Sequence, residues 1–138
     1  MTKALFVDTG AWLAILDPRD KYHGLATAFY QEALVLYPRL TLTNLVAAET
    51  YVSVLRNAGY HKALAFLDIL EQSSSIECVW SDRELEMQAR DILRRYDDQA
   101  FSYTDAVSFA LMEQMDLPEA FAFDNHFSVA GFTRLPTE

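Results

Sequence analysis

The sequence predicts an α/β protein of three layers, in which helices cover both faces of a central parallel sheet of four to five strands. Two observations indicate this α/β/α class. The strand-length segments are short and apolar, which is typical of strands that are buried on both faces. Segments with helical periodicity separate them, so strands and helices alternate along the chain. The chain has 138 residues and shows no linker or internal repeat, so we expect a single domain over residues 1–138.

The expected strands are short, and two of them are uninterrupted apolar runs that stop at an aspartate. The first run, residues 4–7, ends at Asp8-Thr9-Gly10. Another, residues 120–123, also ends at an aspartate, Asp124. Further strands are expected at residues 40–43 and 76–80, and a short edge strand at 132–135.

The expected helices are bounded by proline, glycine and capping residues. Pro38 ends one helix, and Ala58-Gly59 is the stop signal of another. Asn44 is well placed as the N-cap of the helix that follows residues 40–43. Helices are therefore expected at residues 11–16, 22–36, 44–57, 61–71 and 82–96, and from Ser102 or Thr104 to about residue 116.

Composition limits the class of protein. Eleven Lys and Arg stand against 20 Asp and Glu, a net charge of −9, which argues against a large basic surface for nucleic acid. The same excess is compatible with an acidic pocket that attracts divalent cations.

The single cysteine, Cys78, cannot form an internal disulfide, which favours a reducing compartment. With neither a signal peptide nor an apolar run long enough to span a membrane, a soluble, cytoplasmic protein is expected.

Two aspartates at matching positions indicate a site. Ligands of parallel α/β sheets bind beyond the carboxyl ends of the strands. Asp8 and Asp124 each follow an apolar strand, so in neighbouring strands their carboxylates would leave the same edge. Either aspartate taken alone could simply cap the next helix, an interaction that contributes only about 1 kcal/mol.

Glu49 is the only charged residue between residues 40 and 55. Its helix is apolar almost all round, so we expect Glu49 to be buried on most sides. A buried carboxylate loses several kcal/mol of hydration unless a cation or several hydrogen-bond donors compensate. A structural ion pair with Arg56, seven residues later on roughly the same face, is the alternative explanation.

Asp105 stands three residues after Ser102, which matches a capping box with Asp in place of Glu or Gln. This local role is compatible with cation binding, because a side chain in the first turn also points away from the sheet edge.

Four carboxylates in one pocket would repel one another, and a hard divalent cation removes that repulsion. Mg²⁺ or Mn²⁺ prefers oxygen ligands and needs few of them from the protein. No His and Cys cluster has zinc spacing, and His126 lacks a partner histidine. Ions bound in this way support hydrolysis of phosphodiesters without a covalent nucleophile of the protein. The sequence also lacks a GxSxG elbow, a CxxC motif and a GxxxxGK loop.

Over almost its full length the chain resembles the PIN-domain ribonucleases that act as VapC-type toxins of bacterial toxin–antitoxin pairs. The resemblance rests on four segments in this order and at these spacings: residues 5–12 (LFVDTGAW), 43–50 (TNLVAAET), 102–108 (SYTDAVS) and 122–127 (AFDNHF).

The resemblance implies a flavodoxin-like α/β/α fold and an endoribonuclease that depends on Mg²⁺ or Mn²⁺. It also implies an RNA substrate, a homodimer, and inhibition by a small antitoxin protein. One departure is Gly10, where relatives often carry Ser or Asn. The residues implied to bind the metal are Asp8, Glu49, Asp105 and Asp124, and the supporting residues are Thr9, Asn44 and Thr104.

Other acidic α/β proteins fit less well. A phosphoacceptor receiver domain would need a carboxylate pair and a late lysine, and no lysine occurs after Lys62. A haloacid-dehalogenase-type phosphatase would need Asp-x-Asp where this chain has Asp8-Thr9-Gly10. The remaining alternative is a catalytically weak or inactive PIN-like module that binds a partner protein.

Overall fold

The computed structural model describes residues 4–137, so residues 1–3 and 138 of the expected domain lie outside the described part. It contains one five-stranded sheet in the order β3-β2-β1-β4-β5, and every neighbouring pair of strands is parallel. The strands are β1 (Leu5–Val7), β2 (Leu40–Thr43), β3 (Ile76–Val79), β4 (Glu119–Phe121) and β5 (Thr133–Leu135).

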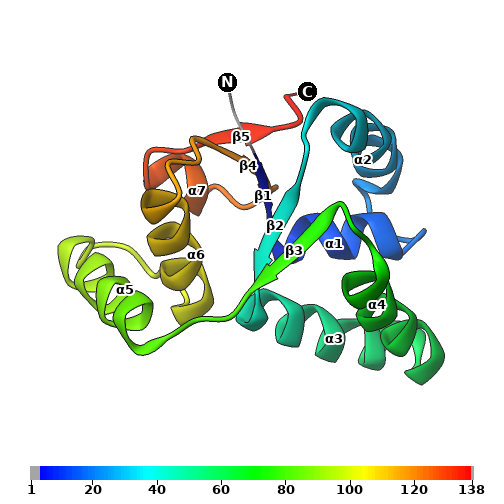
Figure 1. Cartoon of the computed structure of the whole chain (residues 1–138), viewed down its shortest axis with the longest axis horizontal. Helices are drawn as coiled ribbons and strands as arrows, with labels where there is room; N and C mark the ends of the chain where they lie inside the picture. The colour runs from blue at the N-terminus through cyan, green and yellow to red at the C-terminus, as the bar shows by residue number, and fades with distance from the viewer. Residues whose placement is uncertain (1–3, 138) are drawn as a thin grey trace.

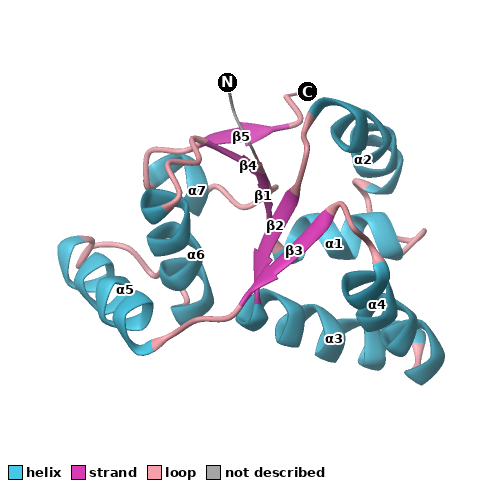
Figure 2. Ribbon diagram, in the orientation of Figure 1, coloured by secondary structure: helices cyan, strands magenta, loops and turns pink. Residues whose placement is uncertain are grey.

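Helices connect the strands and form the two outer layers. On one side of the sheet lie α1, α2 and α4, with α3 extending towards them from the carboxyl edge; on the other side lie α5, α6 and α7 (Figures 1 and 2). The predicted three-layer fold with a central parallel sheet is confirmed. The helices are α1 (Thr9–Leu16), α2 (His23–Leu36), α3 (Asn44–Ala58), α4 (Tyr60–Gln72), α5 (Arg83–Arg95), α6 (Tyr103–Gln114) and α7 (His126–Val129).

The central strand β1 is buried completely, and so is most of its neighbour β4, as the continuous apolar runs predict. All three residues of β1 have no exposed surface, and neither do Ala120 and Phe121 of β4. Large aromatic side chains fill the space between the sheet and the helices, where each buried ring contributes roughly 2–3 kcal/mol by leaving water. The fully buried large aromatics are Phe6, Trp12, Phe66, Phe109, Phe121 and Phe127.

Two local predictions are corrected. The N-cap of α3 is Thr43, whose hydroxyl accepts a hydrogen bond from the Val46 backbone N–H (3.1 Å), whereas Asn44 is already the first helical residue. Helix α7 is absent from the predicted helices, because four residues are too few to show a helical period.

The parallel arrangement puts the carboxyl ends of β1, β2 and β4 at one edge of the sheet, which we call the carboxyl edge. Helices α1 and α3 begin there directly after β1 and β2. None of the helices described over residues 4–137 is long and apolar enough to cross a membrane.

Candidate metal-binding active site

Asp8 follows β1 directly and lies between two neighbouring elements. Its backbone N–H donates to the Phe121 carbonyl at the end of β4 (3.0 Å), and its own carbonyl accepts the first bonds of α1. The side chain stands at the N-cap position of α1 but makes no capping hydrogen bond, and the residue is only 5% exposed. The N-cap position therefore supplies no strong hydrogen bond that would compensate for the burial of this carboxylate.

Burial is the main cause that raises the pKa of Asp8 from 3.8 to about 7. Repulsion from the carboxylates of Asp105 and Asp124 raises it further, while the backbone N–H groups of Thr9 and Gly10 lower it. A carboxylate that is both buried and close to other acids is a candidate for a functional site.

Asp105 is fixed by the capping box that the sequence predicts. The Ser102 hydroxyl accepts from the Asp105 backbone N–H (2.9 Å), and Asp105 Oδ2 accepts from the Ser102 backbone N–H (3.2 Å). The residue is 8% exposed at the start of α6. The Asp105 carboxylate is thus held by the capping box at the N-terminus of α6.

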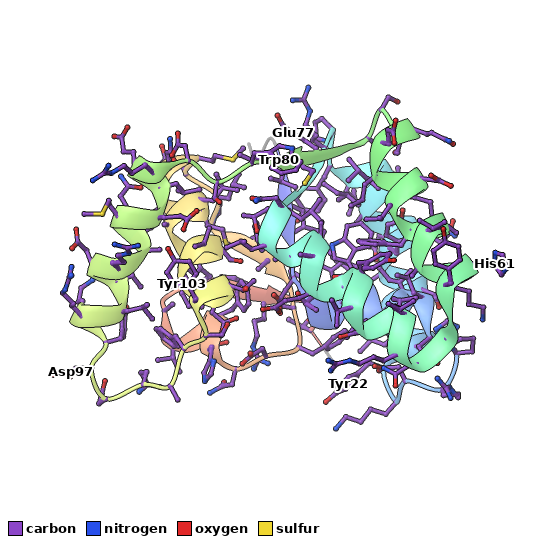
Figure 3. All side chains as sticks on the ribbon, turned by 90° about the horizontal axis from the view of Figure 1, so that it is seen from below. Tyr22, His61, Glu77, Trp80, Asp97 and Tyr103 are labelled. Carbon is purple, nitrogen blue, oxygen red and sulfur yellow. The ribbon has the colours of Figure 1, made fainter. Side chains whose placement is uncertain are left out.

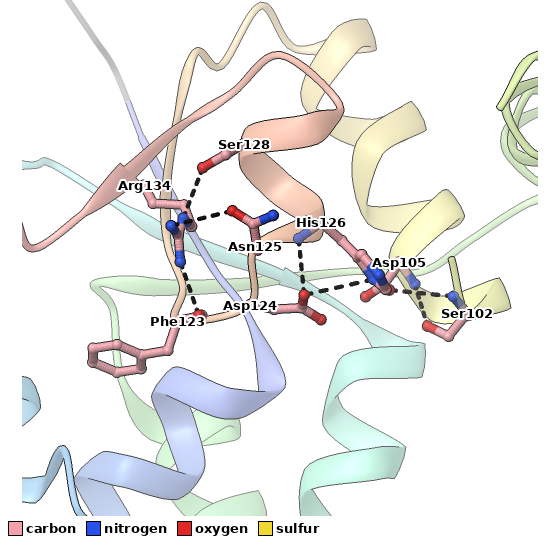
Figure 4. Close-up of polar contacts among 8 residues, drawn as sticks. All are labelled: Ser102, Asp105, Phe123, Asp124, Asn125, His126, Ser128 and Arg134. Carbon is pink, nitrogen blue, oxygen red and sulfur yellow. Dashed lines mark hydrogen bonds and ion pairs between the residues drawn. The ribbon is translucent and has the colours of Figure 1, made fainter. Parts of the chain in front are cut away.

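Asp124 lies in the loop that connects β4 to α7. Strand β4 ends at Phe121, two residues earlier than predicted, so Asp124 does not follow the strand directly. Its side chain is 41% exposed, and Oδ1 accepts from the His126 backbone N–H (2.8 Å). The His126 ring brings Asp124 and Asp105 together, because Nδ1 lies 3.1 Å from Asp105 Oδ2 and 3.5 Å from Asp124 Oδ1 (Figure 4).

The expectation that Glu49 is buried on most sides is wrong, because the residue is exposed. Helix α3 is apolar, yet only one of its faces packs on the sheet, and Glu49 lies outside that face; its buried residues are Val46, Ala47, Thr50 and Val54.

Glu49 nevertheless points to the site. Its Oε2 accepts from the Thr104 hydroxyl (2.5 Å) and its Oε1 from the Thr9 hydroxyl (3.5 Å). Thr9 follows Asp8 and Thr104 precedes Asp105, so both hydroxyls tie Glu49 to the other acids. These contacts replace the ion pair with Arg56 that sequence reasoning left open.

Asn44, the third expected supporting residue, has a structural partner. Its Oδ1 accepts from the Ser81 backbone N–H (2.8 Å), which ties the start of α3 to the segment after β3. No described hydrogen bond joins Asn44 to the four acids, in contrast to Thr9 and Thr104.

Arg134 on β5 holds the loop that carries Asp124. It donates from Nε to the Ser128 hydroxyl (2.7 Å) and from an η-nitrogen to the Phe123 carbonyl (2.9 Å) (Figure 4). The second η-nitrogen reaches Asn125 Oδ1 (3.5 Å). One guanidinium therefore bridges the backbone just before Asp124 and the helix just after it, which fixes the direction of that carboxylate.

The donor set fits a hard divalent cation. One ligand atom from each of Asp105, Asp124 and His126 lies within 4.8 Å of the others. Asp8 belongs to the same edge, because β1 pairs with β4 and the charges of Asp105 and Asp124 raise the pKa of Asp8. Carboxylate oxygens are the ligands that Mg²⁺ and Mn²⁺ favour, and a cation would relieve the repulsion that raises the pKa of Asp8.

The family model of the PIN domain matches residues 5–133. The chain belongs to the PIN domain family. This PIN domain is 36% identical over 135 residues to the 23S rRNA-specific endonuclease VapC20 of Mycobacterium tuberculosis, covering 97% of this chain and 99% of that protein. It is 29% identical to a VapC ribonuclease of Archaeoglobus fulgidus, with 95% of this chain and 83% of the relative covered. The predicted resemblance to VapC-type PIN domains is confirmed.

Solved structures agree with this family. The crystal structure of Mycobacterium tuberculosis VapC20, described as a sarcin-ricin loop cleaving toxin, matches with a TM-score of 0.87 at 33% identity over 94% of this chain and 96% of that one. FitAcB from Neisseria gonorrhoeae matches with a TM-score of 0.66 at 18% identity over 96% of each chain, a likeness that shows the fold alone.

Sequence reasoning missed His126 and Arg134. His126 was set aside because it has no histidine partner, although its position two residues after Asp124 is the signal that could have found it. Arg134 gives no such signal, because only the pairing of β4 with β5 brings it to the loop.

Proposed function

We propose that this PIN domain is a divalent-metal-dependent endoribonuclease whose metal-binding acids are Asp8, Glu49, Asp105 and Asp124. The observation that carries the proposal is the group of acids at the carboxyl edge, where one ligand atom from each of Asp105, Asp124 and His126 lies within 4.8 Å of the others. Beside them, burial first and the charges of Asp105 and Asp124 second raise the pKa of Asp8 to about 7. The near full-length identity with VapC20, which is named an endonuclease, supports the same activity.

The cation proposed for the site is Mg²⁺ or Mn²⁺. Once bound, it supplies Lewis-acid activation of a phosphodiester and of the attacking water. The protein's own part is positioning. The Thr9 and Thr104 hydroxyls orient the two oxygens of Glu49, and the capping box holds Asp105.

RNA is the proposed substrate class, and 23S rRNA is the first substrate to test because VapC20 is named for it. The net charge of −9 opposes the approach of RNA, so bound divalent ions would also contribute to holding the phosphates. A reducing, cytoplasmic location, where ribosomes and a single free cysteine both belong, is part of the proposal.

A cleavage assay on purified 23S rRNA tests the activity. We expect cleavage with Mg²⁺ or Mn²⁺, loss of cleavage in EDTA, and recovery when Mn²⁺ is added back. Asp105→Asn should reduce the rate by at least about a hundredfold, since it removes a charged ligand. Asp97→Asn is the matched control, because Asp97 is exposed at the end of α5 (Figure 3). Cleavage that survives exhaustive chelation, or that Asp105→Asn leaves intact, would refute the proposal.

We further propose that a small antitoxin protein inhibits the enzyme, as the description of VapC20 as a toxin suggests. Co-expression with the product of the neighbouring reading frame tests this. A stable complex with suppressed RNA cleavage is expected, and full activity in the presence of that product would contradict it.

The proposed homodimer has a candidate surface. A groove of about 580 Å³ lies between α3, α4 and the end of β3, and among the residues that line it only Glu71 is charged. Trp80 at its rim is 76% exposed (Figure 3). Two copies that each carry a net charge of −9 repel one another, so they would associate best through such an uncharged surface. Light scattering should give twice the mass of one chain, and Trp80→Asp should give the monomer; an unchanged mass would exclude this surface.

An inactive PIN-like module that binds a partner protein is the alternative function. It predicts weak Mn²⁺ binding and no RNA cleavage in the assay above, even with Asp8, Glu49, Asp105 and Asp124 intact.

A further inference from the structure

His126 is fixed next to the acids by its backbone. Its N–H donates to Asp124 Oδ1 (2.8 Å), so the residue that begins α7 is tied to one of the proposed metal-binding acids. The loop that carries both residues is held from the other side by Arg134, through the Phe123 carbonyl and the Ser128 hydroxyl. These hydrogen bonds hold the loop, and the loop in turn holds the imidazole next to the acids.

The ring itself is held by packing. The edge of Phe101, which is 8% exposed, meets the imidazole at 5.1 Å between ring centroids and 66° between ring planes. Phe101 is in turn fixed against Phe109, a core aromatic at 5.0 Å. This contact supports the ring orientation in which Nδ1 faces Asp105 and Asp124 (Figure 4).

The distances suit a shared ion. Neighbouring ligands of an octahedral ion, each about 2.1 Å away, lie about 3 Å from one another. The Nδ1 atom of His126 lies 3.1 Å from Asp105 Oδ2 and 3.5 Å from Asp124 Oδ1, and the three ligand atoms all fall within 4.8 Å of one another. One cation between them could contact the nitrogen and an oxygen from each acid with only small movements of side chains.

We infer that His126 Nδ1 is a direct ligand of the catalytic cation and makes the site prefer Mn²⁺ over Mg²⁺. This inference rests on the metal-binding site proposed above. Mg²⁺ strongly prefers oxygen, whereas first-row transition ions accept imidazole nitrogen, so a nitrogen ligand contributes more to the binding of Mn²⁺. A site made of carboxylates alone would lack this contribution.

Pulsed electron paramagnetic resonance of Mn²⁺ bound to the untagged protein tests the inference directly. The wild-type spectrum should contain the coupling of a directly bound imidazole ¹⁴N, and His126→Gln should abolish it. Gln can still donate a hydrogen bond to Asp105, so this variant separates a ligand from a group that only positions the acid. The other two histidines in the chain are His23 and His61. His61 is exposed on α4, so His61→Gln is the matched control and should leave the coupling unchanged.

Calorimetric titrations supply the second readout. His126→Gln should weaken Mn²⁺ binding by about tenfold while it changes Mg²⁺ binding by less than about threefold. Absence of ¹⁴N coupling in the wild type, or an equal loss of affinity for both ions, would overturn the inference. If the wild type binds Mn²⁺ and cleaves RNA but shows no ¹⁴N coupling, the inference alone fails. If it binds no divalent ion at all, the proposed function fails with it.

Discussion

Replacing Asp8 by Asn removes one charge from the carboxyl edge while it keeps the size and most of the shape of the side chain. Asp8 is 5% exposed, and burial together with repulsion from Asp105 and Asp124 raises its pKa to about 7. Asparagine is neutral at every pH, so the variant avoids this repulsion. We expect Asp8→Asn to abolish metal-dependent cleavage and to make the metal-free protein more stable at neutral pH.

The pKa values give the magnitude. A rise from 3.8 in the unfolded chain to about 7 in the fold corresponds to about 4 kcal/mol. The folded state binds the proton more tightly than the unfolded state, so this stabilisation is complete below about pH 4 and is lost as pH rises to about 7. Above that pH the difference between the two proteins stays constant. Asp8→Asn should therefore gain up to about 4 kcal/mol relative to the wild type between pH 4 and pH 8.

Urea unfolding in EDTA, measured at intervals from pH 4 to pH 8, provides the test. The free energy of unfolding of the wild type should fall relative to that of Asp8→Asn as pH rises. Contributions from all other titrating groups largely cancel in the difference between the two proteins. Asp97→Asn, the exposed control, should follow the wild type at every pH. Parallel curves for the wild type and Asp8→Asn would show that burial and the neighbouring charges do not raise the pKa of Asp8, and this support for the cation site would be lost.

Three further predictions concern the same site. Mn²⁺ at about a hundred times its dissociation constant should raise the free energy of unfolding of the wild type by about 2.7 kcal/mol at pH 8. The same urea unfolding measurement on Asp8→Asn should show little change in this free energy. Ser102→Ala removes the hydroxyl that accepts from the Asp105 N–H and should lower that free energy by about 1 kcal/mol, with weaker Mn²⁺ binding in calorimetry. Arg134→Gln frees the Phe123 carbonyl and should weaken Mn²⁺ binding about tenfold in the same titration; unchanged affinity would show that Arg134 does not position Asp124.

Much of the site follows from the sequence through topology. Apolar strands that alternate with helices predict a parallel sheet, and a parallel sheet places the residues after its strands at one edge. This reasoning is sufficient to place both Asp8 and Asp124 at the carboxyl edge. The capping box of Asp105 was readable as well, because it depends only on residues three apart in the chain.

The orientation of helix α3 was not predictable from its composition. Because Val52 and Leu55 are also apolar, the sequence does not reveal that they lie on an exposed face, at 42% and 39%. Glu49 was therefore expected to be buried, when it is exposed and held by two threonine hydroxyls instead. The contacts of Glu49 with Thr9 and Thr104 join residues 40 and 55 positions apart, which no local pattern encodes.

His126 and Arg134 were missed for a related reason. Their roles depend on the loop between β4 and β5, whose path is set by hydrogen bonds between the side chain of Arg134 and atoms of the loop and of α7. A histidine without a partner histidine gives no metal signature in a sequence, yet the fold supplies carboxylate partners from two different elements.

We propose that Asp8, Asp105 and Asp124, which the parallel sheet brings to the carboxyl edge, bind a divalent cation there. Anomalous scattering from a crystal grown with Mn²⁺ measures this directly. We expect a strong manganese peak between the Asp105 and Asp124 carboxylates, next to Asp8. A crystal in saturating Mn²⁺ that showed no peak at this edge, or a peak only at other surface acids, would contradict it.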